Sequence, residues 1–174
     1  SAYAHGGPGS VLLKSATQTY GELIIDNAGI DWNEAELPSL GKGTALAGTT
    51  GATLVTDRTT DIPQYFAGHY VEITNGATVK GLWRVASVTA KTVTLAPNGS
   101  ETISLAVGDK WQGIYRFDKV RLSNRGKVYS GDPIRTTDLD TTAGTVEMRT
   151  AVETTNLSIA NGAWMWASSI KAQT

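Results

Sequence analysis

Hydrophobic and polar residues alternate over short stretches of this chain, and turn residues interrupt the stretches every few positions. Three stretches share one pattern, in which an alternating apolar segment leads into Asn, then Gly, then a second apolar segment. They lie at residues 23–32, 120–129 and 157–164. Asn and Gly tolerate the left-handed backbone that turns a chain sharply. A recurring strand–turn–strand unit therefore predicts the stacked coils of a β-solenoid.

The spacing of the three copies predicts that a segment with a different fold is inserted between coils of the solenoid. Asn27 and Asn124 are 97 residues apart (124 − 27), whereas Asn124 and Asn161 are 37 apart (161 − 124). Solenoid coils usually take ~20 to 45 residues, so the first gap holds more than one coil. We expect solenoid coils at residues 1–43 and 114–174 and an inserted small β-barrel at residues 44–113.

The individual strands follow from the same alternation. Residues 82–88 and 92–95 alternate with period two and predict a hairpin. Residues 11–14 predict a short buried strand, and residues 20–27 predict the next strand, which we expect to form a successive face of the same coil. No segment has the periodicity of a long helix, so the sequence predicts an all-β protein.

Composition excludes several classes of function. The chain has 15 basic and 16 acidic residues and a net charge of -1, which gives no field for nucleic acid or an anionic membrane. It contains no Cys, which excludes disulfides, thiolate metal sites and thiol nucleophiles. No apolar run reaches the ~20 residues of a membrane span, so we expect no membrane insertion. The amino terminus has no signal-peptide pattern, and we expect a segment excised from a longer protein.

Five tryptophans suggest a ligand that stacks on aromatic rings. Trp83 and Trp111 lie in alternating apolar stretches, so we expect them in the core of the inserted unit. Trp164 and Trp166 are two residues apart and should share one strand face. Together with Trp32, they are the candidates for a carbohydrate platform, or for a surface that packs against a neighbouring coil.

Acidic residues near the carboxy terminus are the candidate metal ligands. Asp138 and Asp140 are separated by one residue, and Asp132 lies six positions before Asp138. Alternate side chains of an extended segment point the same way, so these carboxylates could hold Ca²⁺. The segment lacks the Gly and the distal Glu of a calcium-binding loop, and short Asp-x-Asp pairs are frequent in exposed turns, which is the simpler explanation.

A family resemblance supports the solenoid. Residues 6–14 and 19–27, together with residues 107–109 and 115–120, resemble segments of very large bacterial cell-surface or secreted proteins built on parallel β-helices. The resemblance implies a right-handed parallel β-helix fragment in an adhesin-like extracellular protein. Those proteins share no catalytic motif, so the resemblance assigns no active residue.

Three hypotheses of function follow. The first is a non-enzymatic structural or adhesive module, whose partners are adjacent coils or domains of its parent protein and whose inserted unit presents a binding surface. The second is a carbohydrate-binding module that stacks polysaccharide on its exposed tryptophans. The third is a polysaccharide lyase or hydrolase of the β-helix type, whose components would be Asp132, Asp138, Asp140, Arg135 and Arg149.

Overall fold

The computed structural model describes residues 9–31 and 34–172. The chain divides into two compact units, which we describe separately. The first unit comprises Ser1–Pro38 and Arg116–Thr174, and the second unit comprises Ser39–Tyr115. In the described residues the one helical segment is the 3-10 turn η1 (Gln64–Phe66). The expected all-β class is confirmed, and the first unit is a β-solenoid of about three turns.

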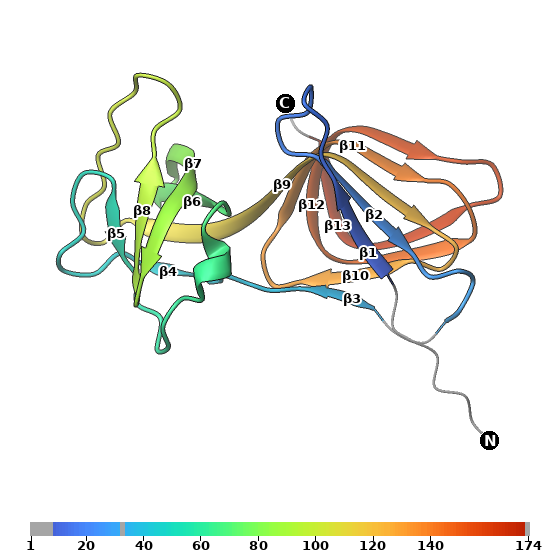
Figure 1. The fold of residues 1–174 in the computed structure, drawn as a ribbon, viewed down its shortest axis with the longest axis horizontal. Coiled ribbons are helices and arrows are strands. Elements are labelled where there is room, and N and C mark those ends of the chain that lie inside the picture. Colours follow the sequence, from blue (N-terminus) through green and yellow to red (C-terminus); the bar gives the residue numbers. More distant parts are fainter. Residues whose placement is uncertain (1–8, 32–33, 173–174) are drawn as a thin grey trace. The chain divides into compact units, whose positions relative to one another are not determined.

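The first unit contains two stacks of parallel strands (Figure 1). In the first stack, β2 (Glu22–Asp26) pairs with the second half of β9 (Lys110–Ser123), and β11 (Ile134–Thr141) lies next to β9. The second half of β12 (Thr145–Ile159) and of β13 (Trp164–Ala172) follow. We call this stack sheet one.

The second stack, sheet two, is built by the strands that follow each turn. Here β3 (Ala35–Leu37) pairs with β10 (Lys127–Ser130), which pairs with the first half of β12, which in turn pairs with the first half of β13. The chain therefore passes from sheet one to sheet two and back three times between β9 and β13. Each passage adds one coil.

The layering predicted from the repeated pattern is confirmed by the strand register. Ile25 pairs with Leu122, and Thr141 pairs with Ile159. The turns stack as well, because the Gly29 N–H donates to Asn124 O at 2.9 Å and the Asn124 N–H donates to Ala143 O at 2.9 Å. The three predicted copies thus lie on one another, with a further level at residues 142–144 between the second and third.

That extra level corrects the coil length. On sheet one, contacts between successive levels join residues 18 apart, such as Arg135 with Glu153 and Glu153 with Lys171. On sheet two the step is 20 residues from Lys127 to Glu147 and 19 from Thr145 to Trp164. The interval of 37 residues therefore holds two coils, although its length falls within the ~20 to 45 residues usual for one coil. The intermediate turn has Thr-Thr-Ala-Gly in place of an Asn-Gly pair, so it does not share the sequence pattern of the other turns.

The first strand of the structure also differs from the prediction. β1 (Gly9–Leu13) is an antiparallel partner of β2 and does not form a successive face of the same coil. Its residues are exposed, including Val11, Leu12 and Leu13, whereas the sequence predicted a buried strand. The alternation of polar and apolar residues does not distinguish an edge strand from an inner one, because the burial of each face depends on residues that are distant in sequence.

The glycines of the turns serve two different needs. Gly29, Gly144 and Gly162 adopt positive φ, where a side chain would be strained. Gly126 does not, and the left-handed residues of its turn are Asn124 and Arg125. A Cβ at Gly126 would lie 2.6 Å from the carbonyl oxygen of Ile25 in the preceding level. Gly126 is therefore needed for the close approach of two coils.

The second unit is an antiparallel sheet around its own core. The strand order is β4 (Lys42–Thr44), the first half of β9, β6 (Tyr70–Asn75), β7 (Thr78–Thr89), β8 (Thr92–Ala96) and β5 (Thr53–Val55). β7 and β8 form the predicted hairpin. Trp83 and Trp111 are buried in this core, as predicted. The inserted small barrel itself stays a prediction.

Replacement of Gly126 by Ala should destabilise the first unit by about 1–3 kcal/mol, the usual range for a side chain forced into packed structure. The added methyl group meets backbone of Ile25, which cannot rotate away. Urea unfolding followed by far-ultraviolet circular dichroism measures the loss. Gly9→Ala is the matched control, since its Cβ would meet nothing within 4 Å. Equal losses in the two variants would contradict the close approach.

Candidate functional site

The two carboxy-terminal tryptophans lie on the outer face of sheet two. Trp164 and Trp166 pair with Thr145 and Glu147, whereas Met165 between them pairs with the buried Val146. Because successive side chains of a strand alternate, both tryptophans point outward, and they are 71% and 70% exposed. The third candidate, Trp32, lies outside the described residues. The predicted common face of Trp164 and Trp166 is thus confirmed by the register.

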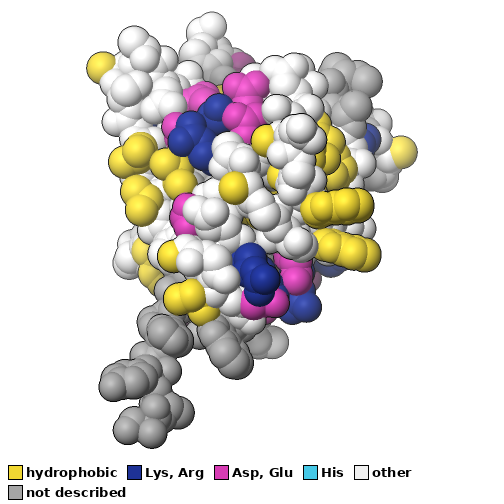
Figure 2. Space-filling view, turned by 90° about the vertical axis from the view of Figure 1, so that its right-hand side faces the viewer, with side chains coloured by type: hydrophobic (Ala, Val, Ile, Leu, Met, Phe, Trp, Pro, Cys, Tyr) yellow, Lys and Arg dark blue, Asp and Glu magenta, His cyan; other side chains and the backbone are white. Residues whose placement is uncertain are grey.

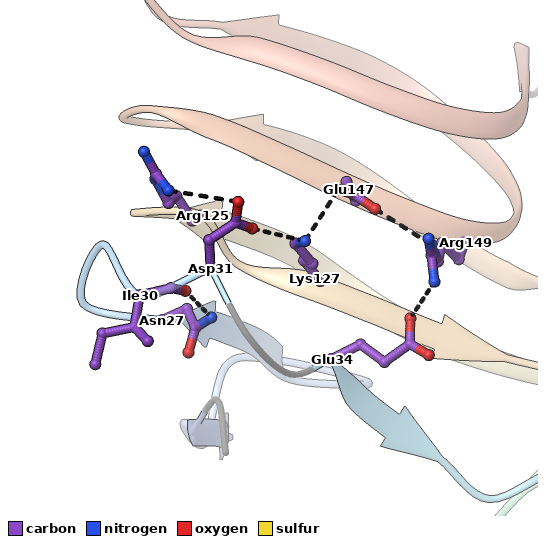
Figure 3. A network of polar contacts seen from close by, with 8 residues as sticks. All are labelled: Asn27, Ile30, Asp31, Glu34, Arg125, Lys127, Glu147 and Arg149. Atoms are coloured by element: carbon purple, nitrogen blue, oxygen red, sulfur yellow. Dashed lines mark hydrogen bonds and ion pairs between the residues drawn. The ribbon is translucent and has the colours of Figure 1, made fainter. Parts of the chain in front are cut away.

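A network of ion pairs borders this aromatic pair on sheet two (Figure 3). The Lys127 ammonium lies 2.7 Å from Asp31 and 3.1 Å from Glu147, and Arg149 lies 3.2 Å from both Glu147 and Glu34. Glu147 is also the strand partner of Trp166. The network therefore runs from the first turn across two levels to the aromatic pair.

The charges of this network hold one another in their ionised forms. The hydrogen bond and the charge of Lys127 lower the pKa of Asp31. The hydrogen bonds to Asp31 and Glu147 raise the pKa of Lys127, against the opposing effect of burial. Figure 2 shows that one face of the molecule carries such mixed clusters of acidic and basic side chains beside projecting hydrophobic ones.

A second set of charges forms a ladder on sheet one. Arg135, Glu153 and Lys171 occupy the same position in three successive levels. One Glu153 oxygen accepts a hydrogen bond from Arg135 Nε, and the other lies 3.2 Å from Lys171 Nζ. Burial raises the pKa of Glu153, but the hydrogen bonds and charges of Arg135 and Lys171 outweigh it and lower the pKa. We call these three residues the charge ladder.

The candidate metal ligands are not brought together as a set. Asp138 accepts a hydrogen bond from Asn156 at 2.7 Å, and Asp140 forms an ion pair with Lys119. Asp132 is fully buried in the turn between β10 and β11. Within residues 9–31 and 34–172, no group of three or more His, Cys, Asp or Glu side chains is placed to hold a metal ion. Calcium binding at these residues stays a prediction.

The residues proposed for polysaccharide cleavage are distributed over both sheets. Arg135 belongs to the charge ladder on sheet one, and Arg149 to the ion-pair network on sheet two. A lyase or hydrolase requires its acid, base and charge-stabilising groups around one substrate bond. Cleavage of polysaccharide at these five residues stays a prediction.

One sequence signal for the charge ladder was missed. Residues 134–140 read Ile-Arg-Thr-Thr-Asp-Leu-Asp, and residues 152–158 read Val-Glu-Thr-Thr-Asn-Leu-Ser. The two segments are 18 residues apart and pair in register. Their buried threonines bond the backbone in the same way, since Thr136 donates to Asp138 O and Thr154 donates to Asn156 O. A search for this repeat would have found the coil length.

The second unit has one buried carboxylate. Asp109 accepts hydrogen bonds from Lys80 Nζ at 2.7 Å, from the Ala106 N–H at 2.9 Å and from Asn75 Nδ2 at 2.9 Å. Burial raises the pKa of Asp109, yet these three donors together lower it.

Three exposed hydrophobic residues lie close in sequence to the partners of Asp109. Val79 precedes Lys80, Val107 lies two residues before Asp109, and Leu46 follows Ala45, whose N–H donates to Asp109 O. Hydrogen bonds of Asp109 thus join three chain segments, each of which carries one exposed apolar residue, Leu46, Val79 or Val107. We call these three residues the apolar turn cluster.

Comparison of the chain with protein-family models, with curated proteins and with solved structures gives no match. In the part of the chain that the structure describes, no helix could cross a membrane. The assignment of function therefore depends on the geometry of the molecule itself.

The charge ladder predicts a defined pH dependence. Because the folded-state pKa of Glu153 is lowered, its stabilisation is complete above the ordinary value of 4.5 and is lost as pH falls through the folded-state pKa. Glu153→Gln should therefore reduce the free energy of unfolding at pH 7 and lose this difference as the pH falls below the lowered folded-state pKa of Glu153. Urea unfolding across this pH range measures it. Glu36→Gln, at an exposed position of β3, is the control and should show a smaller difference at pH 7.

Proposed function

We propose that this chain is a non-enzymatic structural module of a large extracellular or cell-surface protein, in which the solenoid is the scaffold and the second unit presents a contact surface. The observation that carries the proposal is that charged side chains form ion pairs between successive coils. Lys127, Glu147 and Glu153 each take part in such a pair, so these charges stabilise the stacking of coils. A coil buries its apolar face only against its neighbours, which suits a spacer of variable length.

The contact surface in this proposal is the apolar turn cluster of the second unit. Leu46, Val79 and Val107 are each more than two-fifths exposed, and the chain segments that carry them are joined by hydrogen bonds to Asp109. Contiguous patches of exposed apolar side chains are typical of surfaces that bind other proteins. The extracellular location and the adhesin-like parent rest on the sequence resemblance.

A second candidate function is carbohydrate binding at Trp164 and Trp166. The specific support is that both indoles are outward-facing and about 70% exposed on one strand face. Aromatic faces pack well against the apolar faces of sugar rings. Their neighbours in the ion-pair network supply hydrogen-bonding groups at the border of the platform.

The scaffold proposal predicts that neutral and acidic polysaccharides are neither cleaved nor bound. Incubation with a panel of polysaccharides, followed by measurement of released oligosaccharides and of tryptophan fluorescence, tests both points. Cleavage that Asp138→Asn and Asp140→Asn abolish would overturn the scaffold in favour of an enzyme.

The same panel of polysaccharides distinguishes carbohydrate binding from the scaffold function. A saturable fluorescence shift that is absent in the double variant Trp164→Ala/Trp166→Ala would assign the tryptophans to glycan binding. Tyr65→Ala is the control, because Tyr65 is similarly exposed, at 65%, but lies in the second unit. Since both indoles are on the surface, the double variant should change the unfolding free energy by no more than ~1 kcal/mol.

A further inference from the structure

The two ends of sheet one differ. At one end β1 runs antiparallel to β2 and ends the run of parallel strands. At the other end, among the described residues, β13 pairs with β12 alone. Its second edge therefore presents unpaired backbone N–H and C=O groups in the direction in which the coils repeat. Such an edge is a template for another strand.

The apolar columns inside the solenoid lose their cover at this end. Val152 of β12 is buried, whereas its strand partner Ile170 of β13 is 41% exposed. Ile134, the partner of Val152 in the level before, is buried as well. The same side-chain positions that are core in one level are thus partly open to solvent in the next. A strand added to β13 would restore apolar neighbours to this end of the stack.

The charge ladder shows what chemistry such a strand needs. The sign alternates from Arg135 to Glu153 to Lys171. Adjacent strands are ~4.8 Å apart, so like charges in neighbouring levels repel and opposite charges attract. The side chain of Lys171 is 77% exposed and meets a carboxylate on its β12 side. On the other side, the next level of the ladder should be acidic.

We propose that the open edge of β13 binds a further solenoid coil, as a parallel strand that carries a carboxylate opposite Lys171 and an apolar side chain opposite Ile170. This inference rests on the scaffold function and names the partner of that scaffold. A second copy of this chain does not meet the requirement through its end strands. β1 contains no acidic residue, and neither does β13.

The chain itself supplies a coil with which to test the proposal. A copy of residues 139–156 appended after Thr174 continues the step of 18 residues, so it places the copied Glu153 opposite Lys171 and the copied Val152 opposite Ile170. The matched control is the same extension with the copied Glu153 changed to Lys. Hydrogen exchange of the β13 amides is measured in the unextended chain and in both extended chains, with the β11 amides as an internal reference for folding.

We expect the β13 amides to exchange at least about tenfold more slowly with the Glu-bearing coil, and to regain most of the unextended rate with the Lys-bearing coil. Equal protection by both coils would overturn the carboxylate requirement. No protection by either, with β11 still protected, would overturn the docking of a coil. Protection that rises with the concentration of the unextended chain would identify a second copy as the occupant and also overturn the proposal.

A peptide of residues 139–156 added to the unmodified chain provides a measurement that does not depend on folding of the extension. Saturable protection of β13 by the Glu peptide and weaker protection by its Lys variant support the proposal, and the absence of both contradicts it. Failure of the scaffold function would be observed differently, as cleavage or binding of polysaccharide by the unextended chain.

Discussion

The parallel hydrogen bonding of one coil upon the next is the interaction on which the first unit depends. Each level pairs with its neighbour over whole strands, as β2 does with β9 and β11 with β12. The same pairing aligns buried side chains into columns, such as Ile25 with Leu122. A shift of one residue would move these side chains to the solvent face. Backbone pairing and apolar burial therefore specify one register together.

Charged residues contribute more to the choice of strand register than to the free energy of unfolding. A surface ion pair contributes only about 0–1 kcal/mol. In the charge ladder, however, Glu153 lies between Arg135 and Lys171, and a slip of the strands would separate all three. On sheet two, Lys127 joins Asp31 of the first turn to Glu147 of a later level. Opposite charges are thus used between coils to reject wrong registers.

Sequence spacing predicted which candidate site residues share a strand face, but not which residues of neighbouring strands they contact. It placed Trp164 and Trp166 on a common face because strand side chains alternate locally. It also indicated that Asp138 and Asp140 point the same way, but not that each has a partner on a neighbouring strand, Asn156 and Lys119. Whether a carboxylate is free for a ligand depends on strands that are distant in sequence.

The sequence alone determined the all-β class, the recurrence of a strand–turn–strand unit, and the core positions of Trp83 and Trp111. These features follow from alternation and turn chemistry, which act over a few residues. Tertiary structure decided the coil length, the edge position of β1, the charge ladder and the exposure at β13. These features depend on hydrogen bonds between residues that are 18 or 97 positions apart, such as Asn156 with Asp138 and Ser123 with Asp26. Such residues meet only when the coils stack.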